Sequence, residues 1–346
     1  IVGMGSMIVQ AEAVADYLEK TRGLKIGILN MTMFRPFPGD LIGHALKGKK
    51  GVVVLERTDQ PLAEDLPLMR EIRAAISKCA ENGSNGKSTV YEGYATYSKN
   101  TDAPPLYSGC FGLGSRDFQP EGIVGAIENM LPDGLKKKFF YLSIDFVRDQ
   151  ASNPKQEIHM QKLLDDYPQI KDLAIRGSEN PNLLPENSIT VRMHSVGGWG
   201  AITTGKNLVM TLYDLLGYDI KANPKYGSEK KGQPTTYYLS AAPEPIRISC
   251  EYHYVDVVLS PDPNVFGHSN PLYGLKKNGA FIIQSNLASP EEVWATIPFN
   301  SQKFIIDNEI RIFYIDGFKI AKEEASTAEL EFRMQGNSFQ GAFFAA

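Results

Sequence analysis

The sequence of 346 residues predicts an α/β protein made of two α/β domains. Short apolar runs, typical of buried parallel strands, alternate with helical patterns over residues 1–145. The same alternation returns over residues 188–346. Between them, residues 146–187 lose the alternation and include two closely spaced prolines. We therefore expect a parallel sheet with helices on both faces in the first domain, and a linker that joins it to a second α/β domain.

The first domain is expected to span residues 1–145. A turn at residues 3–6 follows an initial strand, and the apolar positions after it repeat every three to four residues, as in a helix. Pro120 suits the first turn of another helix, because proline lacks the N–H that is unpaired there. The expected helices cover about residues 8–20, 64–80 and 120–130, and the expected strands cover residues 25–30 and 52–55.

The linker is expected to span residues 146–187 and to contain a helix near residues 156–167. The second domain then begins with an alternating strand at residues 189–194, a glycine-rich turn, and a helix from Lys206 to Leu216. The further expected strands are residues 236–240, 246–251, 255–260, 281–285 and 311–315, and the further expected helices are residues 290–295 and 318–324.

The composition excludes several classes of function. The chain has 36 basic and 40 acidic residues, a net charge of −4, which argues against a nucleic-acid partner. It has no apolar stretch of 18 residues, so we expect no membrane association through a spanning helix. Because the chain begins with the strand-like Ile1-Val2 and not with Met, we expect it to be a piece of a longer polypeptide.

The three cysteines, Cys79, Cys110 and Cys250, lie far apart in the sequence. They lack the spacing of a zinc or iron–sulfur site, and the histidines lack metal-ligand spacing, so we predict no metal site in this chain. No nucleophile motif points to a catalytic residue, and we predict none. Scattered thiols suit a reducing compartment, so we expect a cytoplasmic location.

The glycine-rich turn at residues 197–205 is the strongest candidate for a binding site. A turn that leads from a strand into a helix directs backbone N–H groups and the positive end of the helix dipole at a bound anion. The candidate residues are Gly198, Gly200, Gly205 and Lys206. The spacing also resembles a nucleotide-binding P-loop, but Asn207 replaces the Ser or Thr that would bind magnesium. A purely structural turn remains an alternative.

A second candidate is the basic, glycine-bounded loop at residues 226–233. Ser228, Lys230 and Lys231 could close on a phosphate, although a solvated surface loop explains the composition equally well. In the first domain, residues 56–59 follow a buried strand, where parallel sheets bind ligands. A local salt-bridge network is the alternative for these four residues.

Several stretches together resemble pyruvate:ferredoxin oxidoreductase and the wider 2-oxoacid:acceptor oxidoreductase family. The resemblance follows the order of the family and spans nearly the whole chain. The stretches that carry it are residues 2–6, 34–37, 55–58, 111–118, 197–207, 226–232 and 315–321.

The resemblance implies that the first domain is similar to the C-terminal domain of transketolase and that the second is the family's gamma-type domain, which is associated with coenzyme A. The complete enzyme would use thiamine diphosphate with magnesium and iron–sulfur clusters, all held by other domains. It would pass electrons to ferredoxin or flavodoxin and would be a homodimer. Coenzyme A would contact Gly198, Gly200, Gly205, Lys206, Ser228, Lys230 and Lys231. A non-catalytic acyl-carrier or nucleotide-binding module is the alternative function.

Overall fold

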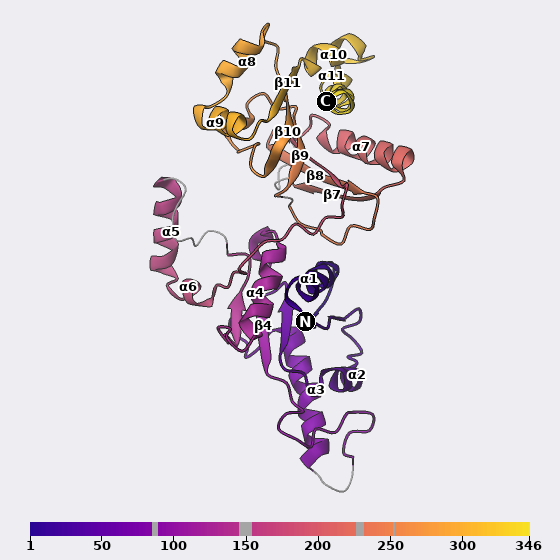
Figure 1. The fold of residues 1–346 in the computed structure, drawn as a ribbon, viewed down its shortest axis with the longest axis vertical. Helices are drawn as coiled ribbons and strands as arrows, with labels where there is room; N and C mark the ends of the chain where they lie inside the picture. Colours follow the sequence, from indigo (N-terminus) through magenta and orange to yellow (C-terminus); the bar gives the residue numbers. More distant parts are fainter. Residues whose placement is uncertain (85–88, 145–153, 226–231, 252) are drawn as a thin grey trace. The chain divides into compact units, whose positions relative to one another are not determined.

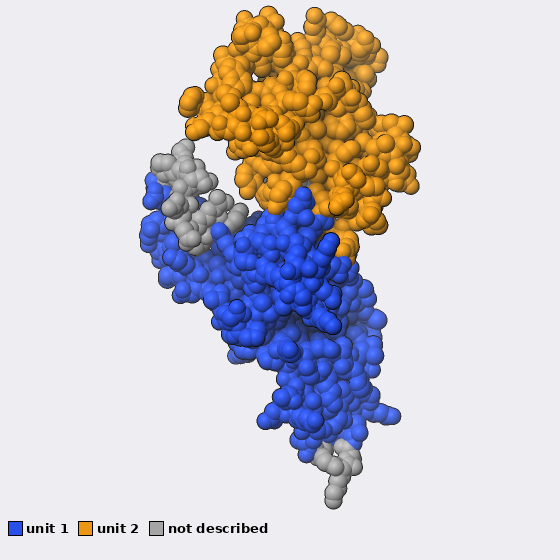
Figure 2. All heavy atoms as spheres, in the orientation of Figure 1, with its two compact units in different colours: residues 1–183 blue, residues 184–346 orange. Residues whose placement is uncertain are grey.

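The computed structural model describes residues 1–84, 89–144, 154–225, 232–251 and 253–346. The chain divides into two compact units, residues 1–183 and residues 184–346 (Figures 1 and 2). Each unit has its own sheet and its own hydrophobic core. None of the helices in the described parts of the chain is long and apolar enough to cross a membrane.

The sheet of the first unit has five strands in the order β2-β1-β3-β4-β5, all parallel. The central strand β3 (Val52–Glu56) is buried along its whole length. Its side chains alternate between two cores, so that Val53 and Leu55 pack in one and Val52 and Val54 in the other. The other strands are β1 (Val2–Gly3), β2 (Leu29–Asn30), β4 (Leu106–Cys110) and β5 (Phe139–Tyr141).

Helices cover both faces of this sheet, which explains why β3 is a continuous apolar run. Residues of α1 (Met7–Arg22) and α4 (Pro120–Met130) pack on the face of Val53. Residues of α2 (Gly39–Leu46) and α3 (Pro67–Ser84) pack on the opposite face. A short 3₁₀ turn, η1 (Leu113–Ser115), follows β4. The expected helices and strands of the first domain are therefore present, with shifted ends.

The segment after the first sheet contains α5 (Pro154–Asp166) and α6 (Gln169–Leu173). The chain beyond them returns to the first unit, where Ala174 pairs with β5 and the side chain of Ile175 is buried in the core. The backbone at residues 176–177 passes so close to α4 that a Cβ on Gly125 would lie 2.7 Å from it. The described residues 154–183 of the expected linker thus belong to the first unit.

The sheet of the second unit has six strands in the order β11-β10-β9-β6-β8-β7. The strands β6, β9, β10 and β11 are parallel, and β8 is antiparallel to both β6 and β7. Their bounds are β6 (Ile189–Val196), β7 (Asp219–Lys225), β8 (Pro234–Ala242), β9 (Val255–Ser260), β10 (Leu275–Gln284) and β11 (Arg311–Ile315).

Helices cover both faces of this sheet as well. Residues of α7 (Ala201–Leu216) and α11 (Ala328–Ala345) pack on one face. Residues of α8 (Pro290–Thr296), α9 (Phe299–Asp307) and the 3₁₀ turn η2 (Val265–Gly267) pack on the other. The remaining helix, α10 (Gly317–Glu324), follows β11.

One predicted strand, residues 246–251, is wrong. Ile246 and Ile248 are buried, which explains the apolar pattern, but the segment is not part of the sheet. The Ile246 N–H donates to the Asp219 carboxylate at 2.7 Å, a hydrogen bond to a side chain and not to the backbone of a neighbouring strand. The helix expected from Lys206 begins earlier, at Ala201.

Candidate functional site

The glycine turn joins the end of β6 to the start of α7. Gly198 and Gly200 have φ angles of +99° and +81°, a region that glycine enters without the steric cost of a Cβ. The Gly197 N–H donates to the Gln233 carbonyl at 2.8 Å, and the Gly232 N–H donates to the Gly197 carbonyl at 2.9 Å. The turn is therefore held to the chain just before β8 by two backbone hydrogen bonds.

Helix α7 begins directly after this turn. Gly200 is its N-cap and offers no side-chain cap, and the first turn of the helix carries no acidic residue. The first N–H groups of an α-helix have no partner within the helix, and the dipole makes this end positive. The start of α7 thus has no acidic group of its own first turn beside it, and the anion site there stays a prediction.

Gly205 and Lys206 lie inside α7, beyond its first turn. A Cβ on Gly205 would lie 2.4 Å from the Tyr237 ring, so this glycine lets α7 pack closely on β8. Lys206 is exposed. In a P-loop the backbone wraps the phosphates ahead of the lysine; here the loop has only four residues, 197–200, and the helix starts before Gly205. The arrangement therefore differs from a nucleotide-binding P-loop.

Ser228, Lys230 and Lys231 lie outside the described residues. The described residues on either side of this predicted lysine loop are the end of β7 and Gly232. Lys225, at the end of β7, pairs with Thr236 in the sheet and forms an ion pair with Glu251. Gly232, which follows the lysine loop, is hydrogen-bonded to Gly197 and therefore lies beside the glycine turn.

The glycine turn lies at the point where the strand order of the sheet reverses. The chain leaves β6 through α7 toward β7 and β8 on one side, and then returns to β9 on the other side. Open α/β sheets bind ligands outside the carboxyl ends of their parallel strands, at such a switch point. The residues that follow β9, β10 and β11 share this edge with the turn.

A buried polar network occupies this edge. The Gln284 side chain donates to the Asp316 carboxylate at 3.1 Å and accepts the Gly317 N–H at 2.9 Å. The Gln335 amide donates to the Pro261 carbonyl at 2.9 Å and to Gln284 Oε1 at 3.3 Å. Asp316 also accepts the Lys319 N–H at 3.1 Å and so caps α10. The network fixes the ends of β9, β10 and β11 relative to α10 and α11.

An Asp–His pair follows β9 at the same edge. Asp262 is 2% exposed, and its Oδ2 lies 2.6 Å from Nε2 of the partly exposed His268. The other oxygen of Asp262 accepts the Asn264 N–H at 2.8 Å. His194, on β6, is buried, and burial lowers its pKa to about 3, with Arg192 and His268 adding to the effect. His194 is accordingly neutral at physiological pH.

A cavity of about 960 Å³ lies beyond the carboxyl ends of β10 and β11. Its lining combines Phe266 and Phe318 with the polar groups of Asn286 and Asp316, and Lys319 and Lys322 also line it. The Phe318 ring contacts the Trp199 ring edge-on, with the centroids 5.1 Å apart. Trp199 belongs to the glycine turn, so the cavity and the turn adjoin one another.

Asp262, His268, Gln284 and Gln335 are not among the site residues that the sequence predicts. A signal exists for Asp262 and Gln284, because each lies at or just beyond the end of an apolar parallel strand, whereas His268 follows only after the turn η2. Gln335 comes from α11, and nothing in the sequence indicates that it reaches this edge. In the described residues, no group of three or more His, Cys, Asp or Glu side chains could hold a metal ion.

At the corresponding edge of the first unit, two carboxylates are hydrogen-bonded to groups of the unit itself. The Glu56 carboxylate accepts the N–H groups of Leu68 and Met69 at 2.6 and 3.1 Å, at the start of α3. Burial raises the pKa of Glu56, and these two hydrogen bonds oppose the shift. Asp59 accepts the Tyr141 hydroxyl at 2.8 Å. Residues 56 and 59 therefore serve local structure through hydrogen bonds.

Cys110 at this edge is not a reactive thiol. Its Sγ donates to the Thr58 carbonyl at 3.0 Å. Burial, with Asp59 and Glu56 nearby, raises the pKa of Cys110 to about 12. Because the thiolate is the nucleophile and the metal ligand, this thiol is inert at neutral pH.

Two family profiles match the chain. The profile of pyruvate ferredoxin/flavodoxin oxidoreductase matches residues 190–346. The profile of core domain II of pyruvate:ferredoxin oxidoreductase matches residues 1–94. The first match falls in the second unit and the second match in the first unit.

Curated relatives match over nearly the whole chain. Pyruvate:ferredoxin oxidoreductase of Moorella thermoacetica is 24% identical over 344 residues, which are 98% of this chain and 25% of that protein. A probable pyruvate-flavodoxin oxidoreductase of Escherichia coli is 25% identical over 337 residues, 97% of this chain and 25% of that protein. The chain thus spans about a quarter of the length of these relatives.

Solved structures also show similarity. A pyruvate oxidoreductase subunit PORC of Thermotoga maritima matches with a TM-score of 0.35 and 20% identity, over 45% of this chain and 74% of that one. A 2-oxoglutarate:ferredoxin oxidoreductase of Magnetococcus marinus matches with a TM-score of 0.32 and 17% identity, over 44% of this chain and 23% of that one.

Proposed function

Because the chain belongs to the family of the pyruvate:ferredoxin and pyruvate:flavodoxin oxidoreductases, we propose that it is part of an enzyme that oxidatively decarboxylates a 2-oxoacid. The complete enzyme makes an acyl-coenzyme A and CO₂ and reduces ferredoxin or flavodoxin. The observation that carries this proposal is the pair of profile matches, one in each unit, in one continuous chain.

The cofactors of such an enzyme, thiamine diphosphate with magnesium and iron–sulfur clusters, do not fit the described residues of this chain. Cys79 and Cys110 are buried in separate parts of the first unit, and Cys250 is buried in the second. The carboxylates at the edge of the first unit are occupied, Glu56 by the N–H groups of α3 and Asp59 by Tyr141. We therefore assign these cofactors to other domains of a cytoplasmic, homodimeric enzyme.

We propose that the second unit binds coenzyme A, with its phosphates over Gly198 and Gly200 at the positive end of α7. Lys206, Lys230 and Lys231 would supply positive charge, and Ser228 would supply a hydroxyl donor. Gly205 contributes indirectly, because it allows α7 to pack on β8. The adjoining cavity, with its aromatic and lysine lining, suits the rest of a long, partly apolar ligand.

The expected affinity depends on these few contacts. A helix N-terminus contributes about 0.3–1 kcal/mol toward a surface anion, and each charge-assisted contact about 1.5–3 kcal/mol. After the cost of association, such a set suits a dissociation constant on the order of micromolar. A substrate that is consumed and released in every turnover is suited to this range.

The experiment that tests the proposed function uses the complete enzyme that contains this chain. With a 2-oxoacid, thiamine diphosphate, coenzyme A and a viologen acceptor, we expect reduction of the viologen that depends on coenzyme A. The 346-residue chain alone should give no turnover under the same conditions. Turnover by the chain alone, or no reduction by the complete enzyme with any 2-oxoacid, would contradict the proposal.

A further inference from the structure

Two residues of β6, Arg192 and His194, have buried nitrogen atoms without a hydrogen-bond partner. Arg192 is 4% exposed and His194 is 7% exposed. Among the described residues, no group is hydrogen-bonded to Nε of Arg192 or to Nε2 of His194. Native proteins leave few buried polar atoms unpaired, because each such atom has lost its hydrogen bonds to water. Two unpaired atoms on one strand therefore indicate that something is bound beside them.

Both side chains lie on the same face of the sheet. Met193, between them, packs in the core with α7 and α11. Because side chains alternate along a strand, Arg192 and His194 lie on the opposite face. The chain between β9 and β10 crosses this face, and Nη2 of Arg192 donates to its Pro271 and Tyr273 carbonyls at 2.7 and 2.6 Å. The unpaired nitrogens thus lie between β6 and the crossing segment, residues 261–274.

Arg192 is a buried cation without a counter-ion in contact. In the described part of the chain it forms no ion pair with a carboxylate. Three acidic residues of this region each have another partner: Glu251 with Lys225, Asp256 with Lys276, and Asp262 with His268. A buried charge is normally paired, because the protein interior replaces its hydration poorly. The missing partner of Arg192 is therefore an anion.

Both unpaired nitrogens can donate to one anion. Nε of arginine always carries a hydrogen, and neutral histidine carries one on Nε2 in one of its two tautomers. Burial and then the charges of Arg192 and His268 lower the pKa of His194, so these side chains are neighbours. A water molecule could pair with the same two nitrogens, but it would leave the charge of Arg192 without a counter-ion.

The anion at this place is compact. Neither Arg192 nor His194 lines the cavity beyond β10 and β11. Both unpaired nitrogens are enclosed by the protein. A phosphate or an organic carboxylate needs room for several heavy atoms, whereas a halide is a single atom that accepts several N–H groups at once.

We propose that the second unit binds one halide ion, chloride under physiological conditions, between Nε of Arg192 and Nε2 of His194. The ion accepts both N–H groups, neutralises the guanidinium, and joins β6 to the crossing segment. Because the glycine turn follows β6 directly, the ion also holds in place the strand that leads into this turn. The inference concerns the interior of the second unit and does not depend on coenzyme A.

The direct test is a crystal structure of the complete enzyme that contains this chain, with bromide in place of chloride. Anomalous scattering distinguishes bromide from water. We expect an anomalous peak at hydrogen-bonding distance from both Arg192 Nε and His194 Nε2. Bromide peaks elsewhere on the enzyme, with none between these two nitrogens, would overturn the proposal and identify the bound species as water.

A second readout is amide exchange of β6 in the same enzyme in solution. An ion that binds only the folded unit slows exchange through unfolding in proportion to its concentration above the dissociation constant. We expect a tenfold increase in chloride to slow exchange at residues 191–195 about tenfold, and the bulkier gluconate at equal ionic strength to have no such effect.

A matched pair of variants links this effect to the site. His194→Phe removes one of the two donors and should lose most of the dependence on chloride. His44→Phe, which changes an exposed histidine of the first unit, should retain it. Equal effects of chloride and gluconate on the wild type, or an unchanged chloride dependence in His194→Phe, would contradict a halide at this place.

Discussion

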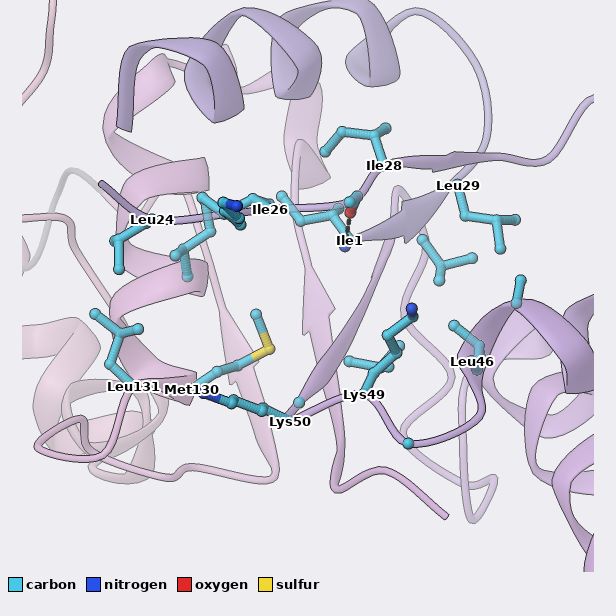
Figure 3. Close-up of a pocket in the computed structure, with 18 of the residues that line it drawn as sticks. Ile1, Leu24, Ile26, Ile28, Leu29, Leu46, Lys49, Lys50, Met130 and Leu131 are labelled. Atoms are coloured by element: carbon cyan, nitrogen blue, oxygen red, sulfur yellow. Dashed lines mark hydrogen bonds between the residues drawn. The ribbon is translucent and has the colours of Figure 1, made fainter. Parts of the chain in front are cut away.

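The two units share an architecture but differ in the edge of the sheet at which a cavity lies. Each has a sheet with a parallel core, covered by helices on both faces. In the first unit, Glu56 and Asp59 at the carboxyl edge are hydrogen-bonded to groups of the unit itself, and a cavity lies at the amino edge (Figure 3). In the second unit the carboxyl edge carries the glycine turn and a cavity. The rule that such sheets bind ligands at the carboxyl edge therefore agrees with the site proposed in the second unit.

The difference arises from the residues at the carboxyl ends of the strands. The last residue of β3 is a glutamate whose carboxylate caps α3, so that the helix end is already paired with a negative charge. After β6 it has glycines, and α7 has no side-chain cap. A helix N-terminus that is neutralised by its own protein cannot serve an external anion, whereas one left without a cap can.

The largest expected effect is a pH dependence of the unfolding free energy that differs between the two units. His194 of the second unit is buried with a pKa of about 3, whereas the first unit's two histidines, His44 and His159, are exposed. The unfolded chain binds a proton near pH 6.5 that the folded unit does not bind, so the second unit loses stability as the pH falls from about 6.5 toward 3. The loss is on the order of 4 kcal/mol when complete.

Chemical unfolding of wild type and His194→Gln at pH 7 and pH 4 measures this effect. Between pH 7 and pH 4 the unfolding free energy of the second unit should fall more in wild type than in His194→Gln. The transition of the first unit should be the same in both proteins. An equal pH dependence of both proteins would show that His194 is accessible to protons in the folded state.

The next effect tests whether the first unit's edge is structural. Glu56→Ala removes the acceptor for two buried N–H groups at the start of α3 and should lower the unfolding free energy by about 2–4 kcal/mol. Glu56→Gln retains one acceptor oxygen and should cost less. Urea unfolding monitored on the first unit measures both. If Glu56→Ala left stability unchanged but altered the activity of the complete enzyme, the edge would have a ligand after all.

A packing effect of about 1–3 kcal/mol is expected in the second unit. In Gly205→Ala the new Cβ would meet the Tyr237 ring at 2.4 Å, so α7 would have to move away from β8. Gly341→Ala is the matched control, since it lies in α11 and a Cβ there meets nothing within 4 Å. The control should be neutral or more stable by about 0.5–1 kcal/mol. Thermal unfolding of both variants measures the effect. Equal stability of Gly205→Ala and the control would refute the packing role of Gly205.

The smallest effect in free energy concerns charge at the proposed coenzyme A site. Lys230→Ala together with Lys231→Ala should weaken coenzyme A binding about tenfold, or about 1.4 kcal/mol, and reduce its dependence on salt. The matched control is Lys49→Ala with Lys50→Ala in the first unit, which should leave the affinity unchanged. Calorimetry at two salt concentrations measures both. Unchanged affinity in the Lys230/Lys231 variant, with an unchanged melting temperature, would identify the loop as solvated surface.

The sequence predicts best the features that depend on local pattern. The continuous runs at Val52–Glu56 and Val255–Ser260 are strands because apolar, β-branched residues suit a buried parallel position. The strand, glycine turn and helix around residue 200 are likewise present. The sequence misses the first five residues of α7, residues 201–205, because they carry little periodic signal.

Features that depend on distant residues could not be predicted. Gln284 and Gln335 meet across 51 positions of sequence, and Ile246 and Ile248 are buried without forming a strand. Helix α11 has a weak apolar pattern, and a Cβ on its Gly336 would overlap the Thr204 side chain of α7. Close helix contacts of this kind are fixed by the tertiary fold, so the edge network of the second unit is visible only in three dimensions.

The central claim is that coenzyme A binds at the carboxyl edge of the second unit and not at that of the first. Backbone amide NMR of the 346-residue chain during titration with coenzyme A tests it most directly. We expect shifts at residues 197–203, at the start of α7, and none at residues 56–59 or 110–114. Shifts at residues 56–59 or 110–114, with residues 197–203 unmoved, would contradict the account.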